Sequence, residues 1–199
     1  MELFYTPTSP YSRKIQILAD HLGLNDRIKM TFLHPLFDKT GQLAAANPLE
    51  KVPTLVLDNG DCIFDSPVIA DALYHFSEAP ALPFEERLKQ QQLQALGDGI
   101  MDAAVLSQME KMREDAEQSE YWQDRWQKAI IRSIDEFENN MIQQAEEWHI
   151  GSMSMACALD YLDLRHPHLH WTTHNKKTYE WYQLAVERDT MITTDPRQA

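Results

Sequence analysis

Ser9 stands where a hydroxyl group could act on a neighbouring thiol, in the run Thr8-Ser9-Pro10-Tyr11. Serine followed by proline suits the N-cap and the first position of a helix. The unpaired N–H groups and the dipole of a helix start stabilise negative charge, and they lower a thiol pKa from about 8.5 to roughly 3.5–7.5. A thiolate placed there would be stabilised by the helix and by the Ser9 hydroxyl. The alternative is that Ser9 only caps the helix.

Val52 and Pro53 mark a place where a bound peptide could pair with the backbone of this chain. Val52 precedes a proline and is therefore biased toward extended backbone, and Pro53 is allowed at the first position of a strand. A cis Val52–Pro53 bond would turn the backbone N–H and C=O of Val52 outward, and Lys51 could meet the anionic end of the peptide. The alternative, an ordinary trans proline, is the more frequent case.

Asp65 and Ser66 could together recognise the free end of an amino acid. Ser66-Pro67 has the pattern of another N-cap followed by proline, and the first amides of a helix bind carboxylates. The Asp65 carboxylate beside them could pair with an α-ammonium group. The alternative is a capped helix with one solvated aspartate.

The three segments fall between short elements that alternate in type over residues 1–77. Four segments have strand-like patterns: Glu2–Tyr5, Arg27–Leu33, Thr54–Leu57 and Cys62–Phe64. Helices are expected after Ser9, over Asp38–Ala46 and after Ser66. The order βαβ–α–ββα predicts a parallel pair of strands and an antiparallel edge, the latter formed by a hairpin at Asn59-Gly60.

A short proline-bearing stretch at residues 78–84 separates this α/β domain from an all-helical domain at residues 85–199. Apolar residues recur there at helical spacing, and no segment has the pattern of a strand. The expected helices are Glu85–Arg113, Ser119–Trp148, Ser154–Leu164 and Thr178–Arg188.

Composition narrows the class of protein further. The formal net charge of −13 over 199 residues disfavours binding to nucleic acid or to anionic membranes. No apolar run approaches the roughly 20 residues of a membrane span, and no signal segment is evident. Cys62 and Cys157 have no paired spacing, which disfavours a disulfide scaffold or a zinc site. We therefore expect a soluble, cytoplasmic protein.

Taken in order, the motifs resemble those of the glutathione transferase family over nearly the whole chain: Ser9-Pro10 with Arg13-Lys14, Asn47-Pro48 with Lys51-Val52-Pro53-Thr54-Leu55, and Asp65-Ser66. The Ser-Pro-Tyr run is most similar to bacterial members of the serine type. The resemblance implies a thioredoxin-like first domain and a homodimer. It also implies a detoxification enzyme that activates the thiol of glutathione, its co-substrate, for attack on a small electrophile, with no prosthetic group.

The resemblance implies a role for each site residue. Ser9 would stabilise the glutathione thiolate, and Val52, with Pro53 in cis, would pair with the cysteinyl part. Asp65 and Ser66 would hold the γ-glutamyl end, with Lys51 near the glycyl carboxylate. The candidates for a second-substrate site between the domains are Tyr11, Met101 and Met109, because methionine suits an adaptable apolar site. The alternative for both methionines is a place in the core.

The chain departs from the family pattern at Glu50, at the core helix of the second domain, and at Arg188-Asp189-Thr190, where members have Arg-Pro-Ser. Members usually have glycine where this chain has Glu50, which adds a negative charge near a ligand with two carboxylates. At the core helix of the second domain, members have a Ser/Thr cap followed three residues later by Asp. Here those positions are Ser154 and Cys157, so half of the capping box would be lost.

Other interpretations stay open. The chain could be a non-catalytic member that binds glutathione or a protein partner, or it could reduce substrates with glutathione through Cys62, for which packing in a strand is the alternative. The alternating residues His166, His168 and His170 could bind a transition metal on an extended segment, or lie in a surface loop. We expect no metal site.

Overall fold

The computed structural model describes residues 1–198 of the chain, which form two compact units. The first unit comprises Met1–Leu82 and the C-terminal segment that begins at Asp189, and the second comprises Pro83–Arg188. The boundary falls within the linker expected at residues 78–84. The segment from Asp189, which we assigned to the helical domain, instead groups with the first unit.

A four-stranded sheet with the strand order β2-β1-β3-β4 forms the centre of the first unit. β1 and β2 are parallel, and β3 is antiparallel to both β1 and β4, which confirms the expected βαβ–α–ββα order and its hairpin. The elements are β1 (Glu2–Tyr5), α1 (Pro10–His21), η1 (Asn25–Arg27), β2 (Lys29–Phe32), α2 (Gln42–Ala46), β3 (Thr54–Val56), β4 (Cys62–Ile63), α3 (Ser66–Phe76), α9 (Asp189–Thr193) and η6 (Pro196–Gln198).

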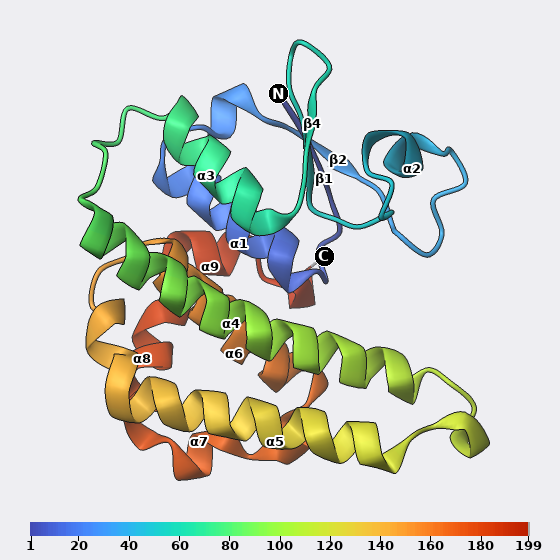
Figure 1. The fold of residues 1–199 in the computed structure, drawn as a ribbon, viewed down its shortest axis with the longest axis vertical. Coiled ribbons are helices and arrows are strands. Elements are labelled where there is room, and N and C mark those ends of the chain that lie inside the picture. Colours follow the sequence, from blue (N-terminus) through green and yellow to red (C-terminus); the bar gives the residue numbers. More distant parts are fainter. Residues whose placement is uncertain (199) are drawn as a thin grey trace. The chain divides into compact units, whose positions relative to one another are not determined.

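Helices cover both faces of this sheet. Figure 1 shows α1 and α3 on one side of the strands and α2 on the other. On the α2 side, Phe4 packs with Leu33 and Leu43 in a small apolar cluster. Successive side chains of a strand alternate between faces, so the fully buried Leu3 and Leu55 point toward α1 and α3. The two central strands, β1 and β3, are therefore covered on both sides.

The outer strand β2 is less buried than the central strand β1. Ile28, just before the strand, is buried, but Met30 and Phe32 are largely exposed. β2 has only one neighbour in the sheet because it lies at the edge. Its register is held by polar contacts in which the Glu2 carboxylate accepts from the Lys29 ammonium at 2.9 Å and from the Thr31 hydroxyl.

The second unit is entirely helical within the described residues. Its helices are α4 (Phe84–Lys111), α5 (Glu120–Glu136), α6 (Ile150–Arg165), α7 (Trp171–His174) and α8 (Lys176–Val186). Shorter helical turns connect them: η2 (Asp115–Glu117), η3 (Phe137–Met141), η4 (Ile142–Ala145) and η5 (Pro167–Leu169). The predicted single helix Ser119–Trp148 is wrong, because α5 ends at Glu136 and continues as a π-helical turn and a 3-10 turn.

α6 is the central helix of this unit. Every residue from Ile150 to Leu162 is buried, as expected for a helix that other helices surround. α4 approaches it closely at Gly97, where an added Cβ would lie 2.8 Å from the backbone carbonyl carbon of Ser154. A side chain at position 97 would therefore push the two helices apart.

The start of α6 differs from the expectation based on Ser154. The N-cap lies five residues earlier, at His149, whose ring Nδ1 accepts from the Gly151 N–H at 3.0 Å. The Ser152 hydroxyl accepts in turn from the His149 N–H at 2.8 Å. Ser154 thus lies inside the helix, fully buried and with no hydrogen-bond partner for its hydroxyl among the described residues.

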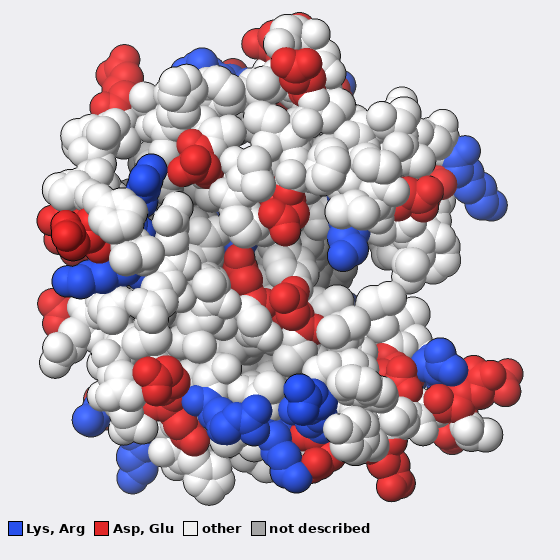
Figure 2. Space-filling model, in the orientation of Figure 1, with Lys and Arg blue, Asp and Glu red and all other residues white. Residues whose placement is uncertain are grey.

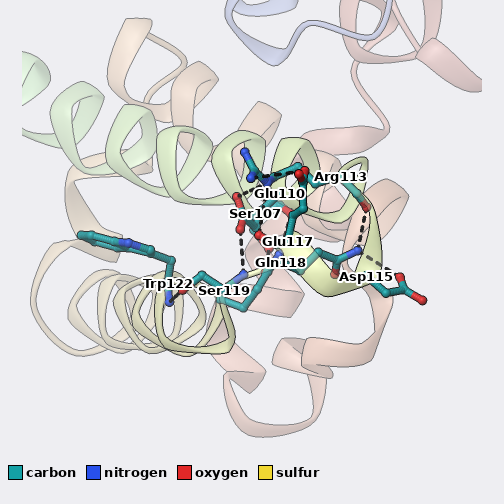
Figure 3. A network of polar contacts seen from close by, with 9 residues as sticks. Ser107, Glu110, Arg113, Asp115, Glu117, Gln118, Ser119 and Trp122 are labelled. Atoms are coloured by element: carbon teal, nitrogen blue, oxygen red, sulfur yellow. Dashed lines mark hydrogen bonds and ion pairs between the residues drawn. The ribbon is translucent and has the colours of Figure 1, made fainter.

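Polar side chains fix the turn between α4 and α5 (Figure 3). The Glu110 carboxylate accepts from the backbone N–H of Ser119 at 2.8 Å, directly before α5. The Gln123 amide donates to the carbonyl oxygen of Ser107 at 3.0 Å and also contacts the Ser107 hydroxyl. These contacts join the last turns of α4 to the first turn of α5.

The surface carries charges of both signs. The face drawn in Figure 2 carries Asp and Glu side chains in many places, and a few Lys and Arg side chains adjoin one another in its lower part. Across residues 1–198, no helix has both the length and the apolar character that a membrane span requires.

Candidate functional site

The sheet register brings the three predicted segments to one edge of the first unit. Phe4 lies opposite Thr54 in the antiparallel β1–β3 pair, so the end of β1 and the start of β3 share this edge. Leu55 lies opposite Ile63 in the β3–β4 pair, so the end of β4 lies there as well. The loop to Ser9, the segment Lys51–Pro53 and the residues Asp65 and Ser66 leave the sheet at this common edge.

Ser9 caps α1 as predicted. Its backbone is extended, its hydroxyl oxygen accepts from the Ser12 N–H at 3.2 Å, and Pro10 occupies the first helical position. The Ser9 side chain is partly exposed, so a ligand can approach it. A hydroxyl has one hydrogen to donate in addition to its acceptor lone pairs. The cap bond uses a lone pair and leaves the Ser9 hydrogen for a ligand atom.

Asn47, a buried residue, holds the loop that carries Lys51 and Val52. Its side-chain amide donates to the Lys51 carbonyl at 3.0 Å and to the Thr54 hydroxyl at 3.1 Å, and its side-chain oxygen accepts from the Leu49 N–H at 2.9 Å. The Thr54 hydroxyl donates to the same Lys51 carbonyl at 2.8 Å. We did not predict this supporting role of Asn47, although the Asn-Pro pair signals a turn.

Val52 offers an unpaired stretch of backbone. The Val52–Pro53 peptide bond is cis, as the resemblance implied, and the Phe64–Asp65 bond is also cis. Within residues 1–198, the N–H and C=O groups of Val52 form no hydrogen bond to another residue. Buried or half-buried backbone groups normally have partners, so an extended ligand could pair with those of Val52.

The N-terminus of α3 also has unpaired groups. Asp65 is the N-cap and Ser66 the first helical residue, one position earlier than the sequence predicted. The Asp65 side chain does not bond to the helix, and the N–H groups of Ser66 and Val68 have no partner among the described residues. Helix N-terminal amides of this kind bind carboxylates.

Two exposed charges of opposite sign flank these backbone groups. In the described part of the chain, neither Lys51 nor Asp65 forms an ion pair. Both charges are therefore free to pair with a ligand that carries a carboxylate and an ammonium group. The edge thus combines a hydroxyl donor, unpaired backbone and two charged groups.

Glu50 adopts left-handed backbone, with a φ of 50°. This conformation is unfavourable for residues with a Cβ, which gives a steric reason for the glycine usual at this position in the family that the sequence resembles. The Glu50 side chain is exposed beside Lys51. Glutamate in place of the usual glycine at position 50 therefore affects the backbone conformation as well as the charge.

The predicted second-substrate residues have different surroundings. Tyr11 is partly buried on α1, in the first unit. Met101 and Met109 lie on α4 in the second unit, where Met101 has no exposed surface and Met109 is half exposed. Their role in a second-substrate site remains a prediction.

The three alternating histidines do not share one face. His166 is fully buried; its Nε2 lies 2.8 Å from the Ala104 carbonyl, whereas His168 and His170 are exposed. Among the described residues, no group of three His, Cys, Asp or Glu side chains could hold a metal ion. Cys62 lies at the turn end of the β3–β4 hairpin, opposite Val56, with its thiol 3.6 Å from the Gly60 carbonyl.

This architecture defines the class of glutathione transferase-fold proteins: a thioredoxin-like sheet domain followed by an all-helical domain. Sequence comparison agrees. The family model described as "Glutathione S-transferase, N-terminal domain" matches residues 8–75. The uncharacterized GST-like protein YibF of Escherichia coli (strain K12) is 34% identical over 206 residues that cover both proteins completely. The chain therefore belongs to the glutathione S-transferase family.

Solved structures of a family member from Pseudomonas fluorescens Pf-5 are similar throughout. One contains bound glutathione and superposes with a TM-score of 0.92 at 35% identity, covering 98% of each chain. The other contains S-(propanoic acid)-glutathione and has a TM-score of 0.88, also at 35% identity, covering 98% of this chain and 99% of that one.

Proposed function

We propose that this chain is a serine-type glutathione transferase, which binds glutathione at the sheet edge of the first unit and activates its thiol. One observation carries this proposal. Ser9, the unpaired backbone of Val52 and the two opposite charges of Lys51 and Asp65 all lie at the same edge of the sheet. The similar protein from Pseudomonas fluorescens Pf-5 contains glutathione in its crystal structure, which supports the same ligand here.

Each part of the edge matches a part of the tripeptide. The backbone of Val52 would pair with the cysteinyl residue of glutathione, as a strand pairs with its neighbour. The Ser66 and Val68 amides would bind the γ-glutamyl carboxylate and Asp65 its ammonium group, while Lys51 would face the glycyl carboxylate. The cysteinyl sulfur would then lie near Ser9.

Ser9 would stabilise the thiolate form of the bound cysteine. The Ser9 O–H would donate to the sulfur, and the positive end of the α1 dipole would add to the effect. The thiol loses its proton to solvent, and the sulfur then forms a bond to an electrophilic carbon. Either a leaving group departs from that carbon with the bonding electron pair, or, in an addition, the electron pair moves to the neighbouring atom, which takes up a proton. No covalent enzyme intermediate is required, because positioning and charge stabilisation supply the catalysis.

The test is a titration of reduced glutathione into the full chain, following thiolate absorbance in the ultraviolet against pH. We expect saturable binding and a bound thiol pKa well below its free value of about 8.5, raised again in Ser9→Ala. S-substituted glutathione, of the kind bound by the Pseudomonas protein, is a second probe because it needs no activation. Absence of binding by both ligands would overturn the proposal.

A non-catalytic member is the alternative function, and the same titration separates it from the enzyme. A binding or protein-interaction module would take up glutathione without lowering its thiol pKa, or would not bind it at all. Reduction through Cys62 has less support, since that thiol lies at the turn end of the hairpin. Cys62→Ser would abolish such an activity and leave conjugation unchanged. The homodimer is a further expectation, which light scattering measures directly.

A further inference from the structure

The C-terminal segment, residues 189–198, packs on the helix that presents Ser9. It forms α9 and η6 and groups with the first unit, although the rest of the helical half does not. α9 contacts α1, and Met191 on α9 is buried. A segment that is last in the sequence therefore supports the first helix.

Arg13 makes the polar contacts between them. Its side chain is 4% exposed; Nη2 donates to the Met191 carbonyl at 2.8 Å and Nε donates to the Thr194 hydroxyl at 3.1 Å. The Thr194 hydroxyl in turn donates to the Thr190 carbonyl at 2.6 Å. The Arg13 guanidinium thus binds both the backbone at Met191 and the side chain of Thr194, whose orientation is fixed by its own hydrogen bond to Thr190.

Arg13 and Ser9 belong to the same helical turn. The Arg13 N–H donates to the Ser9 carbonyl at 3.0 Å, which is the first α-helical hydrogen bond of α1. The Ser12 N–H donates to the Ser9 hydroxyl in the same turn. First turns of helices fray easily because they have few internal hydrogen bonds. A buried side chain anchored one turn from the cap resists this fraying.

We propose that Arg13 is a positioning residue, through which the C-terminal segment holds the Ser9 end of α1 in place. The inference rests on the proposed function for its effect on glutathione, because thiolate stabilisation depends on the position of the Ser9 hydroxyl. In the sequence, Arg13 stands out only as part of the motif Ser9-Pro10 with Arg13-Lys14. The available signal was a cation four positions before the apolar Ile17, which places both on the same face of an amphipathic helix.

The experiment compares Arg13→Met, Arg13→Lys and Thr194→Val in the full chain. Arg197→Met is the matched control, since Arg197 lies on the same segment but is exposed and paired with Asp195. One readout is amide hydrogen exchange at Ser12 and Arg13, with α3 amides as internal reference. The other is the thiol pKa of bound glutathione.

We expect Arg13→Met to accelerate exchange at Ser12 and Arg13 about tenfold or more relative to α3, since local opening reports the lost anchor. The bound thiol pKa should rise toward its free value. Thr194→Val should shift both readouts in the same direction by less, Arg13→Lys should retain part of the parent behaviour, and Arg197→Met should match the parent.

If Arg13 had a purely structural role, Arg13→Met would lower the melting temperature and leave the relative amide exchange and the bound thiol pKa unchanged. That result would overturn the proposal. If Arg13→Met does not fold, Thr194→Val and Arg13→Lys test the proposal instead. Amide exchange and a bound thiol pKa equal to those of the parent in both variants would also overturn the proposal. If the parent chain does not bind glutathione, the proposed function fails, while the exchange measurement still decides whether Arg13 anchors the first turn.

Discussion

The backbone N–H of Ser12 donates to the hydroxyl oxygen of Ser9 at 3.2 Å, so one serine side chain both caps α1 and keeps a hydrogen to donate. Capping and the proposed activation of a thiol therefore depend on different features of the same group. The cap needs only an acceptor oxygen, whereas a bound thiolate needs the hydroxyl hydrogen. Substitutions can separate the two roles.

Ser9→Asp should preserve folding and abolish thiol activation. Aspartate caps helices as well as serine does, so we expect the free energy of unfolding to stay within about 0.5 kcal/mol of the parent. The carboxylate has no hydrogen to donate and repels a thiolate, and loss of such a donor typically costs about 100-fold or more in rate. Urea denaturation and conjugation of a model electrophile measure the two effects.

Ser9→Thr and Ser9→Ala complete this series. Threonine keeps both the cap and the hydroxyl, so it should retain most of the turnover, whereas alanine should lose turnover and about 1 kcal/mol of stability. Parental turnover in Ser9→Asp would show that Ser9 is only a cap.

Local sequence patterns predicted the first unit well. The Asn59-Gly60 hairpin signal and the Ser9-Pro10 cap depend on neighbours in the chain, and the structure confirms both. Alternation located the strand β2, but its residues Met30 and Phe32 are exposed. The assembly of Ser9, Val52 and Asp65 at one edge was not visible in local patterns, because it depends on strand register. The family resemblance supplied that grouping.

Long-range contacts explain the errors. Arg13 and Met191 are 178 positions apart, so no local pattern could place the C-terminal segment on α1. The early start of α6 depends on a histidine ring as cap, which is not among the usual capping residues, so Ser154 was the more obvious candidate. The role of Asn47 likewise appears only when the loop closes on Thr54.

Glu50→Gly should raise both stability and affinity for glutathione. Glycine tolerates a φ of 50°, and the relief of backbone strain, less the extra freedom of glycine in the unfolded chain, should stabilise by roughly 0.5–1 kcal/mol. Removal of the negative charge beside Lys51 should also strengthen binding of a ligand with two carboxylates. Urea denaturation and calorimetric titration measure these changes.

Glu50→Gln is the matched control for charge, because glutamine removes the negative charge and keeps the strained backbone. We expect it to improve glutathione affinity while leaving stability near that of the parent. Equal affinity in the parent, Glu50→Gln and Glu50→Gly would show that the Glu50 charge does not reach the ligand.

His166 should make the folded state less stable as pH falls from about 6.5 to about 4. Burial lowers the pKa of His166 to about 4, opposed by its hydrogen bond to the Ala104 carbonyl and reinforced by the positive charges of Lys111, His168 and Arg165. In the unfolded chain its pKa is near 6.5, so the unfolded state binds more protons between these values.

The expected decrease in the free energy of unfolding is about 2–3 kcal/mol; it begins near pH 6.5 and is complete only below pH 4. Urea denaturation at several pH values measures it. His166→Gln should flatten this part of the pH profile, whereas His170→Gln, at an exposed position, should leave it unchanged. The same slope in the parent and in His166→Gln would assign the pH dependence to other groups.

Gly97→Ala and Gly99→Ala should have opposite effects, although both lie in the middle of α4. A Cβ at position 97 would come within 2.9 Å of the Met155 N and the Ser154 Cβ, and backbone cannot move aside as a flexible side chain can. Overpacking of this kind costs about 1–3 kcal/mol. A Cβ at position 99 meets nothing within 4 Å, so the better helix propensity of alanine should stabilise by about 0.8–1 kcal/mol.

Urea denaturation of the two variants compares them on the same helix, so their difference reports the close approach of α4 to α6 and not helix propensity. Stabilisation by both substitutions would mean that the helices can separate at no cost. Because α6 is buried along most of its length, we expect them not to separate: the small residue at position 97 sets the distance on which the packing of the second unit depends.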